Sequence, residues 1–174
     1  TTPEFGCGLD GLLRLRAQEG RLTGIINGID TDWNPHRDPH LDCHFEAGES
    51  KSRQANAEVV RQAFGLAASR GPLFAVISRL VHQKGVDLTI QATETIVRQG
   101  GQIVVTGRGD ARLEAEITEL ARHYPERVGV KIGYEENLAR QMYAGSDFLL
   151  MPSRFEPCGL TQMRAQRYGA LPVA

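Results

Sequence analysis

Two cations and one carboxylate lie in loops where an apolar run gives way to a helical pattern. Arg79 and Lys84 follow the apolar run 73–77, five positions apart, and Glu156 follows the run 147–151. The guanidinium fork of arginine suits two phosphate oxygens, and the lysine ammonium acts as a mobile point charge. Together with the carboxylate, these groups suit a diphosphate leaving group on a polar substrate, because cations stabilise charge that grows on a departing phosphate. Ordinary surface charge is the alternative.

The loop before the last helical pattern has a second feature that favours anions. Gly159 lets the backbone approach a ligand closely, and the peptide N–H groups of Gly159, Leu160 and Thr161 open a helix. A helix N-terminus favours a negative group, and Glu156 lies just before it. A strand-to-helix turn with a capping glutamate is the alternative, and this loop alone favours neither. Cys158 is not expected to act as a nucleophile, because no base is evident beside it.

Gly107-Arg108-Gly109-Asp110 forms a third loop between an apolar run and a helical pattern. A dinucleotide-binding fingerprint requires a further glycine at position 112, where the chain has Arg112. A tight turn with Asp110 as the helix N-cap is therefore at least as well supported as ligand contact. Tyr134 follows the next apolar run, where its ring is either core packing or a stacking surface for a base.

Apolar runs and helical patterns alternate strictly from residue 73 onward, which predicts a parallel sheet wrapped on both faces, a doubly wound α/β fold. The strand-to-helix loops of such a sheet emerge at one edge, where ligands bind. We therefore expect Arg79, Lys84 and Glu156 to converge on one crevice. The expected strands are 73–77, 102–106, 127–132, 147–150 and 171–174, and the expected helices between them are 86–98, 111–124, 137–144 and 160–168.

The first 72 residues are expected to form helices at 9–18 and 52–64, a short strand at 22–26 and a long polar loop at 30–52. Two patterns in this loop resemble metal ligands: Asp30-Thr31-Asp32, and the set His36, His40, Cys43 and His44. Pro39 opposes a helix there, so the spacing of the histidines need not bring them together. We interpret both patterns as a solvated loop and predict no metal site.

The composition predicts one globular domain with a core, because 41% of the 174 residues are hydrophobic and 24% are charged. The net charge of −1 gives no basic excess that would attract nucleic acid, and no apolar run approaches the roughly 20 residues of a membrane span. Neither kind of partner is expected. The three cysteines form no C-x-x-C pair, so free thiols in a reducing cytosol are the simplest expectation.

At these loops the chain resembles bacterial glycogen synthases and plant starch synthases, and the resemblance extends over nearly its whole length. The stretches that carry it are Thr2-Pro3-Glu4-Phe5-Gly6, Asn27-Gly28-Ile29-Asp30, Ser78-Arg79-Leu80, Gln83-Lys84-Gly85, Gly107-Arg108-Gly109-Asp110, Val128-Gly129-Val130, Gly133-Tyr134, and the run from Ser153 to Gln162. A long match is far more specific than one short motif. The family normally has one more residue between the aspartate and Trp33-Asn34-Pro35, which leaves the shape of that loop open.

The resemblance implies a two-domain glycosyltransferase of the GT-B fold that transfers glucose from ADP-glucose to the non-reducing end of an α-1,4-glucan with retention of configuration. It implies ADP-glucose or ADP, the glucan acceptor and an N-terminal domain as partners. It also implies no cofactor, and a location in the cytoplasm, or in the plastid of a plant. Two alternatives stay open: a related transferase that uses UDP-glucose or another acceptor, and a non-catalytic nucleotide-binding module.

Site residues follow from the resemblance position by position. Glu156, Arg79 and Lys84 are expected to be catalytic, with Glu156 acting either as a nucleophile or only as a stabiliser of positive charge on the sugar. Substrate-binding roles are expected for Asn27, Gly107, Gly109, Tyr134, Cys158, Gly159, Leu160 and Thr161.

Three regions are expected along the chain. Residues 1–27 would be the tail of an N-terminal domain and a hinge, 28–72 a linker loop and helix, and 73–174 a nucleotide-sugar-binding Rossmann-like domain that is incomplete at its C-terminus. The chain starts inside a motif and stops in a predicted strand. A piece of a longer protein, inactive by itself, is therefore expected.

Overall fold

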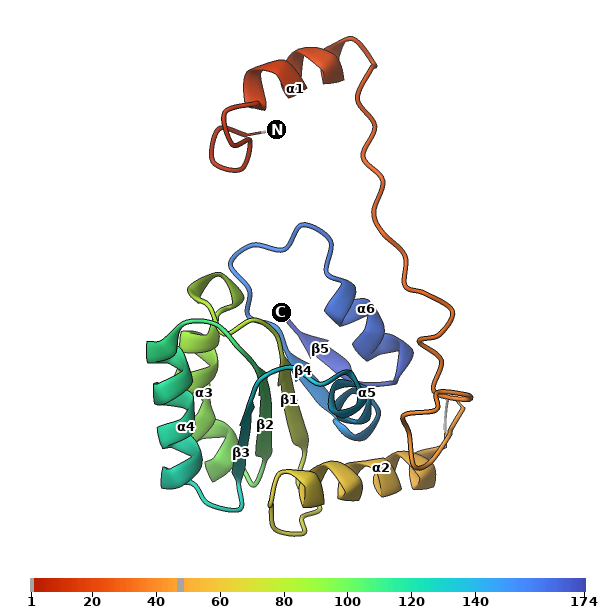
Figure 1. Ribbon diagram of the computed structural model, residues 1–174, viewed down its shortest axis with the longest axis vertical. Coiled ribbons are helices and arrows are strands. Elements are labelled where there is room, and N and C mark those ends of the chain that lie inside the picture. Colours follow the sequence, from red (N-terminus) through yellow and green to blue (C-terminus); the bar gives the residue numbers. More distant parts are fainter. Residues whose placement is uncertain (1, 47–48) are drawn as a thin grey trace.

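The computed structural model describes residues 2–46 and 49–174. A five-stranded parallel sheet in the order β3-β2-β1-β4-β5 forms its centre (Figure 1). The chain builds the sheet outward from β1 in one direction and then in the other, so the order reverses between β1 and β4. Ligands bind at such a switch point in open α/β sheets. The strands are β1 Leu73–Ile77, β2 Gln102–Gly107, β3 Val128–Ile132, β4 Phe148–Leu150 and β5 Leu171–Val173.

Helices cover both faces of the sheet (Figure 1). On one face lie α3 Val86–Arg98 and α4 Ala111–His123, and on the other lie α2 Ser50–Ala63, α5 Glu136–Gly145 and α6 Leu160–Arg167. A short 3-10 helix, η1 His82–Lys84, joins β1 to α3. The predicted doubly wound α/β fold is confirmed, and the bounds predicted for β1 and α3 agree with the structure.

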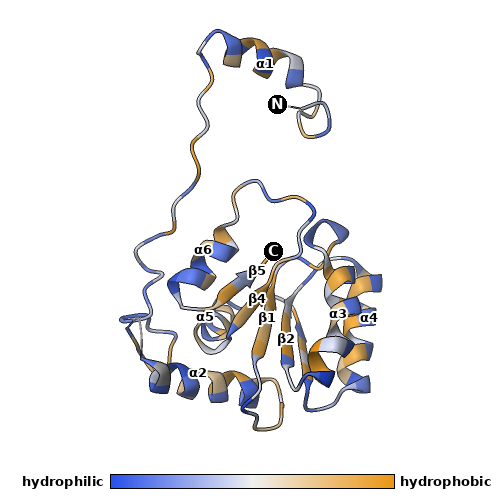
Figure 2. Ribbon diagram, turned by 180° about the vertical axis from the view of Figure 1, so that it is seen from behind, coloured by the Kyte–Doolittle hydropathy of each residue, from blue (hydrophilic) through white to orange (hydrophobic). Residues whose placement is uncertain are grey.

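The central strand β1 is buried on both faces because its side chains point alternately into two cores. Ala75 and Ile77 belong to the core formed with α2, α5 and α6, while Val76 belongs to the core formed with α3 and α4. Figure 2 shows apolar residues concentrated in the strands and hydrophilic residues spread over the surrounding helices. Burial of one valine or isoleucine side chain stabilises the fold by about 1.5–3 kcal/mol, so β1 is a rigid base for the loop that follows it.

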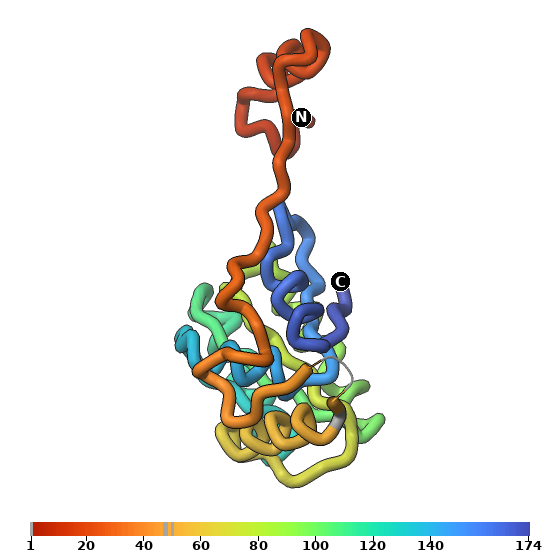
Figure 3. Tube along the Cα trace, turned by 90° about the vertical axis from the view of Figure 1, so that its right-hand side faces the viewer, coloured from red at the N-terminus to blue at the C-terminus, as the bar shows by residue number. Residues whose placement is uncertain are grey.

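The N-terminal segment lies apart from the sheet (Figures 1 and 3). Its helix α1 Asp10–Gln18 has no buried residue, and the strand predicted at 22–26 is wrong. That stretch is extended but pairs with no strand in the described part of the chain, and Ile25 is 88% exposed. A β-strand requires a partner strand for its ladder hydrogen bonds, and this exposed stretch leaves its backbone groups to water instead. Phe5 stacks on Phe155 at a centroid distance of 4.7 Å, which joins this segment to the loop after β4.

The polar loop at 31–46 is only partly solvated, which corrects the prediction. His36 and His44 are exposed as expected, yet apolar residues of the same loop are buried against the sheet domain. Asp38 is fully buried, because Arg140 and Tyr168 bond to its carboxylate. The buried apolar residues of this loop are Trp33, Pro35, Leu41 and Phe45. The domain boundaries expected after residues 27 and 72 remain predictions.

Candidate functional site

Two loops meet at the carboxyl end of β1, one leading through η1 to Gly85 and the other following β4. Gly85 has a positive φ of 67°, and a Cβ at this position would lie 1.9 Å from the carbonyl oxygen of Pro152. A side chain there would clash with backbone that cannot move independently. The contact between the two loops therefore requires glycine at position 85.

Polar contacts fix the loop after β4 onto η1 and α3. Arg154 donates to both oxygens of Asp87, at 2.8 and 2.7 Å, and to the carbonyl oxygen of His82 at 2.7 Å. These hydrogen bonds from Arg154 lower the pKa of Asp87 to about 2. Gln83 adds a second tie, since its Nε2 donates to the carbonyl oxygen of Phe155 at 3.0 Å. We call the Arg154–Asp87 pair together with Gln83 the loop clamp.

The loop clamp brings Lys84 and Glu156 into direct contact. The Lys84 ammonium bonds to Oε1 of Glu156, and the Ser153 hydroxyl donates to the same oxygen at 2.8 Å. The side chains of Lys84 and Glu156 are only 17% and 23% exposed. Arg79 and Thr161 share with them a cavity of about 220 Å³. All three side chains expected to be catalytic, Arg79, Lys84 and Glu156, thus lie around one cavity at the switch point of the sheet.

A second cavity, of about 330 Å³, adjoins the first. The two share four lining residues, Ile77, Ser78, Arg79 and Thr161. The second is otherwise lined by Gly107, Arg108, Tyr134, Tyr143 and Arg164. It combines aromatic rings with guanidinium groups, which suits a ligand that has both a flat ring and negative charge.

The turn after β2 forms one wall of the second cavity by packing tightly on the loop after β1. A Cβ at Gly107 would lie 1.9 Å from the carbonyl oxygen of Ser78, and one at Gly109 would lie 2.4 Å from that of Leu80. Both glycines are therefore needed for backbone packing. Asp110 caps α4 as predicted, accepting hydrogen bonds from the N–H groups of Arg112 and Leu113.

Other residues expected to bind substrate flank the two cavities without lining them: Gly109, Cys158, Gly159 and Leu160. Gly159 has a φ of 79° and precedes α6, the helix start that the sequence predicts. Asn27 lies in the exposed N-terminal segment, where its carbonyl oxygen is 3.8 Å from Sγ of Cys158.

Sequence reasoning assigned no role to several residues at this site, namely Gln83, Ser153, Tyr143 and Arg164. For Arg164, the helical spacing in the sequence could have indicated a place at the site. Arg164 follows Thr161 by three positions in a predicted helix, and residues three apart lie on the same helix face. Tyr143 is almost fully buried, and burial raises its pKa to about 12, while the charge of Arg164 beside it opposes part of that rise. Tyr143 is therefore neutral and available as a hydrogen-bond donor near pH 7.

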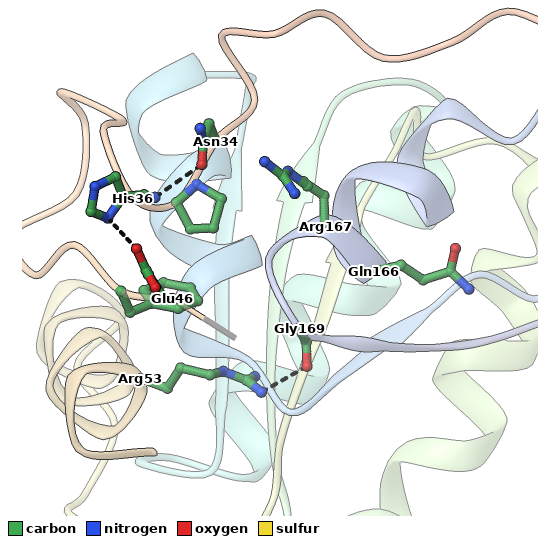
Figure 4. A pocket seen from close by; sticks show the side chains of 9 residues that line it. Asn34, His36, Glu46, Arg53, Gln166, Arg167 and Gly169 are labelled. Atoms are coloured by element: carbon green, nitrogen blue, oxygen red, sulfur yellow. Dashed lines mark hydrogen bonds and ion pairs between the residues drawn. The ribbon is translucent and has the colours of Figure 1, made fainter. Parts of the chain in front are cut away.

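A separate cavity of about 510 Å³ lies between the loop at 31–46, the first half of α2 and the end of α6 (Figure 4). Arg53 donates to the carbonyl oxygens of Gly169 and Ser146 at 2.7 Å each, and His36 lies 3.4 Å from Glu46. The two terminal nitrogens of Arg53 are thus paired with backbone oxygens, while its buried Nε has no partner among the described residues. We assign this cavity no ligand.

The structure also bears on metal and membrane sites. Within residues 2–46 and 49–174 no group of three histidine, cysteine or acidic side chains is arranged to hold a metal ion. Each helix that the structure describes is too short or too polar to reach across a bilayer.

Comparison with known proteins gives three kinds of match. Residues 71–174 match the family model described as glycosyl transferases group 1. Over all 174 residues the chain is 60% identical to a glycogen synthase of Xanthomonas axonopodis pv. citri (strain 306), of which it covers 37%. It is also 60% identical to a glycogen synthase of Pseudomonas syringae pv. syringae (strain B728a), of which it covers 36%. The chain thus spans little more than a third of the length of these relatives.

Solved structures agree with these matches. The catalytic domain of starch synthase IV from Arabidopsis thaliana, bound to ADP and acarbose, has a TM-score of 0.90 and 39% identity, over 98% of this chain and 36% of that one. The glycosyltransferase WaaG, involved in lipopolysaccharide biosynthesis, has a TM-score of 0.61 at 21% identity, over 88% of this chain and 37% of WaaG, and bears on the fold alone. The expected resemblance to glycogen and starch synthases is confirmed.

Proposed function

Because the chain belongs to the glycosyl transferases group 1 family, we propose that the protein is a retaining glucosyltransferase that extends an α-1,4-glucan from ADP-glucose. The observation that carries the proposal is 60% identity to glycogen synthases over all 174 residues. The matched region covers the whole chain and so includes the loops that enclose the cavity between Arg79, Lys84 and Glu156. The starch synthase of known structure contains ADP and acarbose, a nucleotide and a glucan-like ligand, which supports the same donor and acceptor here.

In this proposal Arg79 and Lys84 stabilise the leaving diphosphate. Arg79 lines both cavities, so its guanidinium is suited to a group that spans them. The Lys84 ammonium has three N–H donors and uses one for Glu156, so it can hold a phosphate oxygen at the same time. Both cations act where negative charge grows as the sugar–phosphate bond breaks.

Glu156 would face the donor sugar. As the bond to phosphate breaks, the sugar takes on oxocarbenium-like positive charge, which a carboxylate stabilises or traps covalently. Ser153 and Lys84 both bind Oε1 of Glu156, and so they fix the direction of the carboxylate before substrate arrives. Such preorganisation removes the reorganisation cost during the reaction.

The second cavity would hold the nucleoside. Tyr134 is 60% exposed and lines this cavity, so its ring is accessible for stacking on adenine. Thr161 lies in the first turn of α6, where the helix N-terminus favours the phosphates. The glucan would bind between this domain and an N-terminal domain, a proposal supported by relatives that are nearly three times as long as this chain.

The test is transfer of labelled glucose from ADP-glucose to glycogen by the full-length protein. We expect Arg79→Ala and Lys84→Ala each to lower turnover by about a hundredfold, the usual effect of losing one charge-stabilising donor. Arg98→Ala serves as the control, because Arg98 is an exposed arginine at the end of α3 and should leave turnover unchanged. Near-normal turnover in both site variants would remove these residues from the mechanism. Transfer from UDP-glucose but not from ADP-glucose would overturn the proposed donor.

A further inference from the structure

Arg164 lies in the second turn of α6 and lines the second cavity. Its guanidinium carbon is 3.9 Å from the ring centroid of Trp33, and that of Arg140 is 4.0 Å from the same centroid. Two guanidinium groups cannot occupy the same face of one ring at this distance, so they lie on opposite faces. Trp33 therefore holds Arg164 by stacking. A stacked guanidinium keeps its N–H groups in its own plane, free to bind a partner beyond the ring.

The two arginines on Trp33 differ in their hydrogen bonds. Arg140 bonds to the carboxylates of Asp38 and Glu136, which accounts for its place in the core. Arg164 has a buried Nε that finds no hydrogen-bond partner among the residues the structure describes. A buried N–H group without a partner is costly, and native proteins rarely leave one unpaired without a reason. Arg164 as a whole lines the second cavity, where a ligand can supply a partner for its guanidinium group.

The charge around the second cavity points to the chemistry of that partner. Its lining includes Arg79, Arg108 and Arg164, and no acidic side chain from the described residues. Three cations without a counter-charge favour an anion. Arginine is the side chain best suited to bind phosphate through two parallel hydrogen bonds.

We propose that Arg164 is a specificity-determining residue that binds a phosphate oxygen of the donor nucleotide, held in position by Trp33. This inference rests on the proposed function, because it takes the second cavity as the nucleotide site. It adds a third cation to Arg79 and Lys84, and it extends phosphate binding from the loops onto α6. The role is one of binding and selection by charge, and it requires no covalent step.

The test compares ligands that differ in phosphate number. Binding of adenosine, AMP and ADP to the full-length protein is measured by isothermal titration calorimetry for wild type and Arg164→Gln. We expect ADP to bind about tenfold or more weakly to the variant, the usual loss of a hydrogen bond to a charged group. Adenosine should bind equally to both proteins. Arg122→Gln is the control, since Arg122 is an exposed arginine on α4 that does not line this cavity.

A second variant guards against loss of folding in the first. Arg164→Lys keeps the charge but loses the planar fork, so we expect ADP binding to weaken several-fold with adenosine unchanged. Thermal unfolding of each variant checks the fold. If wild type binds ADP and both Arg164 variants match it, the assignment of Arg164 is overturned while the proposed function stands. Equal weakening of adenosine and ADP also overturns it, because the contact would then be to the nucleoside. Failure of wild type to bind ADP overturns the proposed function, and this inference with it.

Discussion

Replacing Asp38 by asparagine should destabilise the domain by about 3 kcal/mol, because it breaks a buried ion pair from one side. The Asp38 side chain is fully buried, and that of Arg140 is 8% exposed. Oδ2 of Asp38 accepts a hydrogen bond from Nη1 of Arg140 at 3.0 Å and another from the hydroxyl of Tyr168. Oδ1 accepts one from the backbone N–H of His40 at 3.0 Å. In the variant, the asparagine has no charge to offset that of Arg140.

The size of the expected stability loss depends on the hydrogen bonds that Arg140 keeps in the variant. Removing one partner of a buried pair costs about 3–5 kcal/mol. Arg140 also bonds to Glu136, whose side chain is 52% exposed, so part of its charge remains compensated. We therefore expect a loss near the lower end of this range. With a urea dependence of about 2 kcal/mol per molar, the midpoint of unfolding should fall by roughly 1–2 M.

The pH dependence gives a second test. Burial raises the pKa of Asp38, but hydrogen bonds from Tyr168, His40 and Arg140 outweigh burial, and the pKa lies below its ordinary 3.8. A carboxylate with a lowered pKa stabilises the fold above its unfolded pKa, and this contribution is lost as pH falls through the folded pKa. The difference between wild type and Asp38→Asn should therefore be constant from about pH 7 to pH 5 and shrink below about pH 4.

Urea unfolding of the chain can be followed by the fluorescence of Trp33, its one tryptophan, which lies beside Arg140. Asp42→Asn is the matched control, because Asp42 is an exposed carboxylate in the same loop and should change stability by less than about 0.5 kcal/mol. A loss of less than about 1 kcal/mol in Asp38→Asn would refute the argument. So would a difference from wild type that grows as pH falls below 4.

Two further predictions concern the loops of the site. Gly85→Ala should destabilise the protein by at least about 1 kcal/mol more than Gly100→Ala in thermal unfolding, because a Cβ would clash with Pro152 only at the first position, while both glycines have positive φ. Equal losses would show that the loop contact relaxes easily. Asp87→Asn should lower glucose transfer about tenfold by loosening the hold of Arg154, yet change stability by less than about 1 kcal/mol, because the pair is partly exposed. Since the pKa of Asp87 is about 2, the Asp87–Arg154 pair should stay charged above about pH 4. Unchanged glucose transfer in Asp87→Asn would remove the loop clamp from the mechanism.

The sheet could be predicted because its signal is local. Apolar runs in β1 and β2 are each long enough to form a buried strand, and the glycines after the helices mark where each unit ends. The extended stretch at 22–26 has the same local propensity but forms no strand, because pairing depends on a neighbour that a local pattern does not contain. The loop residues of the site were also accessible to prediction, since parallel strands bring their following loops to one edge.

Burial of the polar loop could not be predicted, because its cause is distant in the chain. Asp38 is stabilised by Arg140 and Tyr168, which lie 102 and 130 positions away. An aspartate in a polar stretch is ordinarily exposed, so no local pattern distinguishes this one. Trp33 is a similar case. The sequence predicts a loop at this position, but Tyr143 and Tyr168, which are also distant in the chain, pack against Trp33 and place it in the core.

Trp33 connects the fold to the proposed site. On one face it packs against Arg140, whose position depends on Asp38, and on the other it packs against Arg164 beside the second cavity. Loosening the Asp38 network should therefore weaken nucleotide binding as well as stability, because the stacking surface of Arg164 would shift. The sequence predicts a solvated loop at 30–52, yet through Trp33 the part at 31–46 supports a cation beside the second cavity. From the sequence alone, an arginine on a helix is expected to lie exposed on the surface. Only the structure shows that Trp33, a residue distant in the chain, packs against the Arg164 guanidinium and orients it.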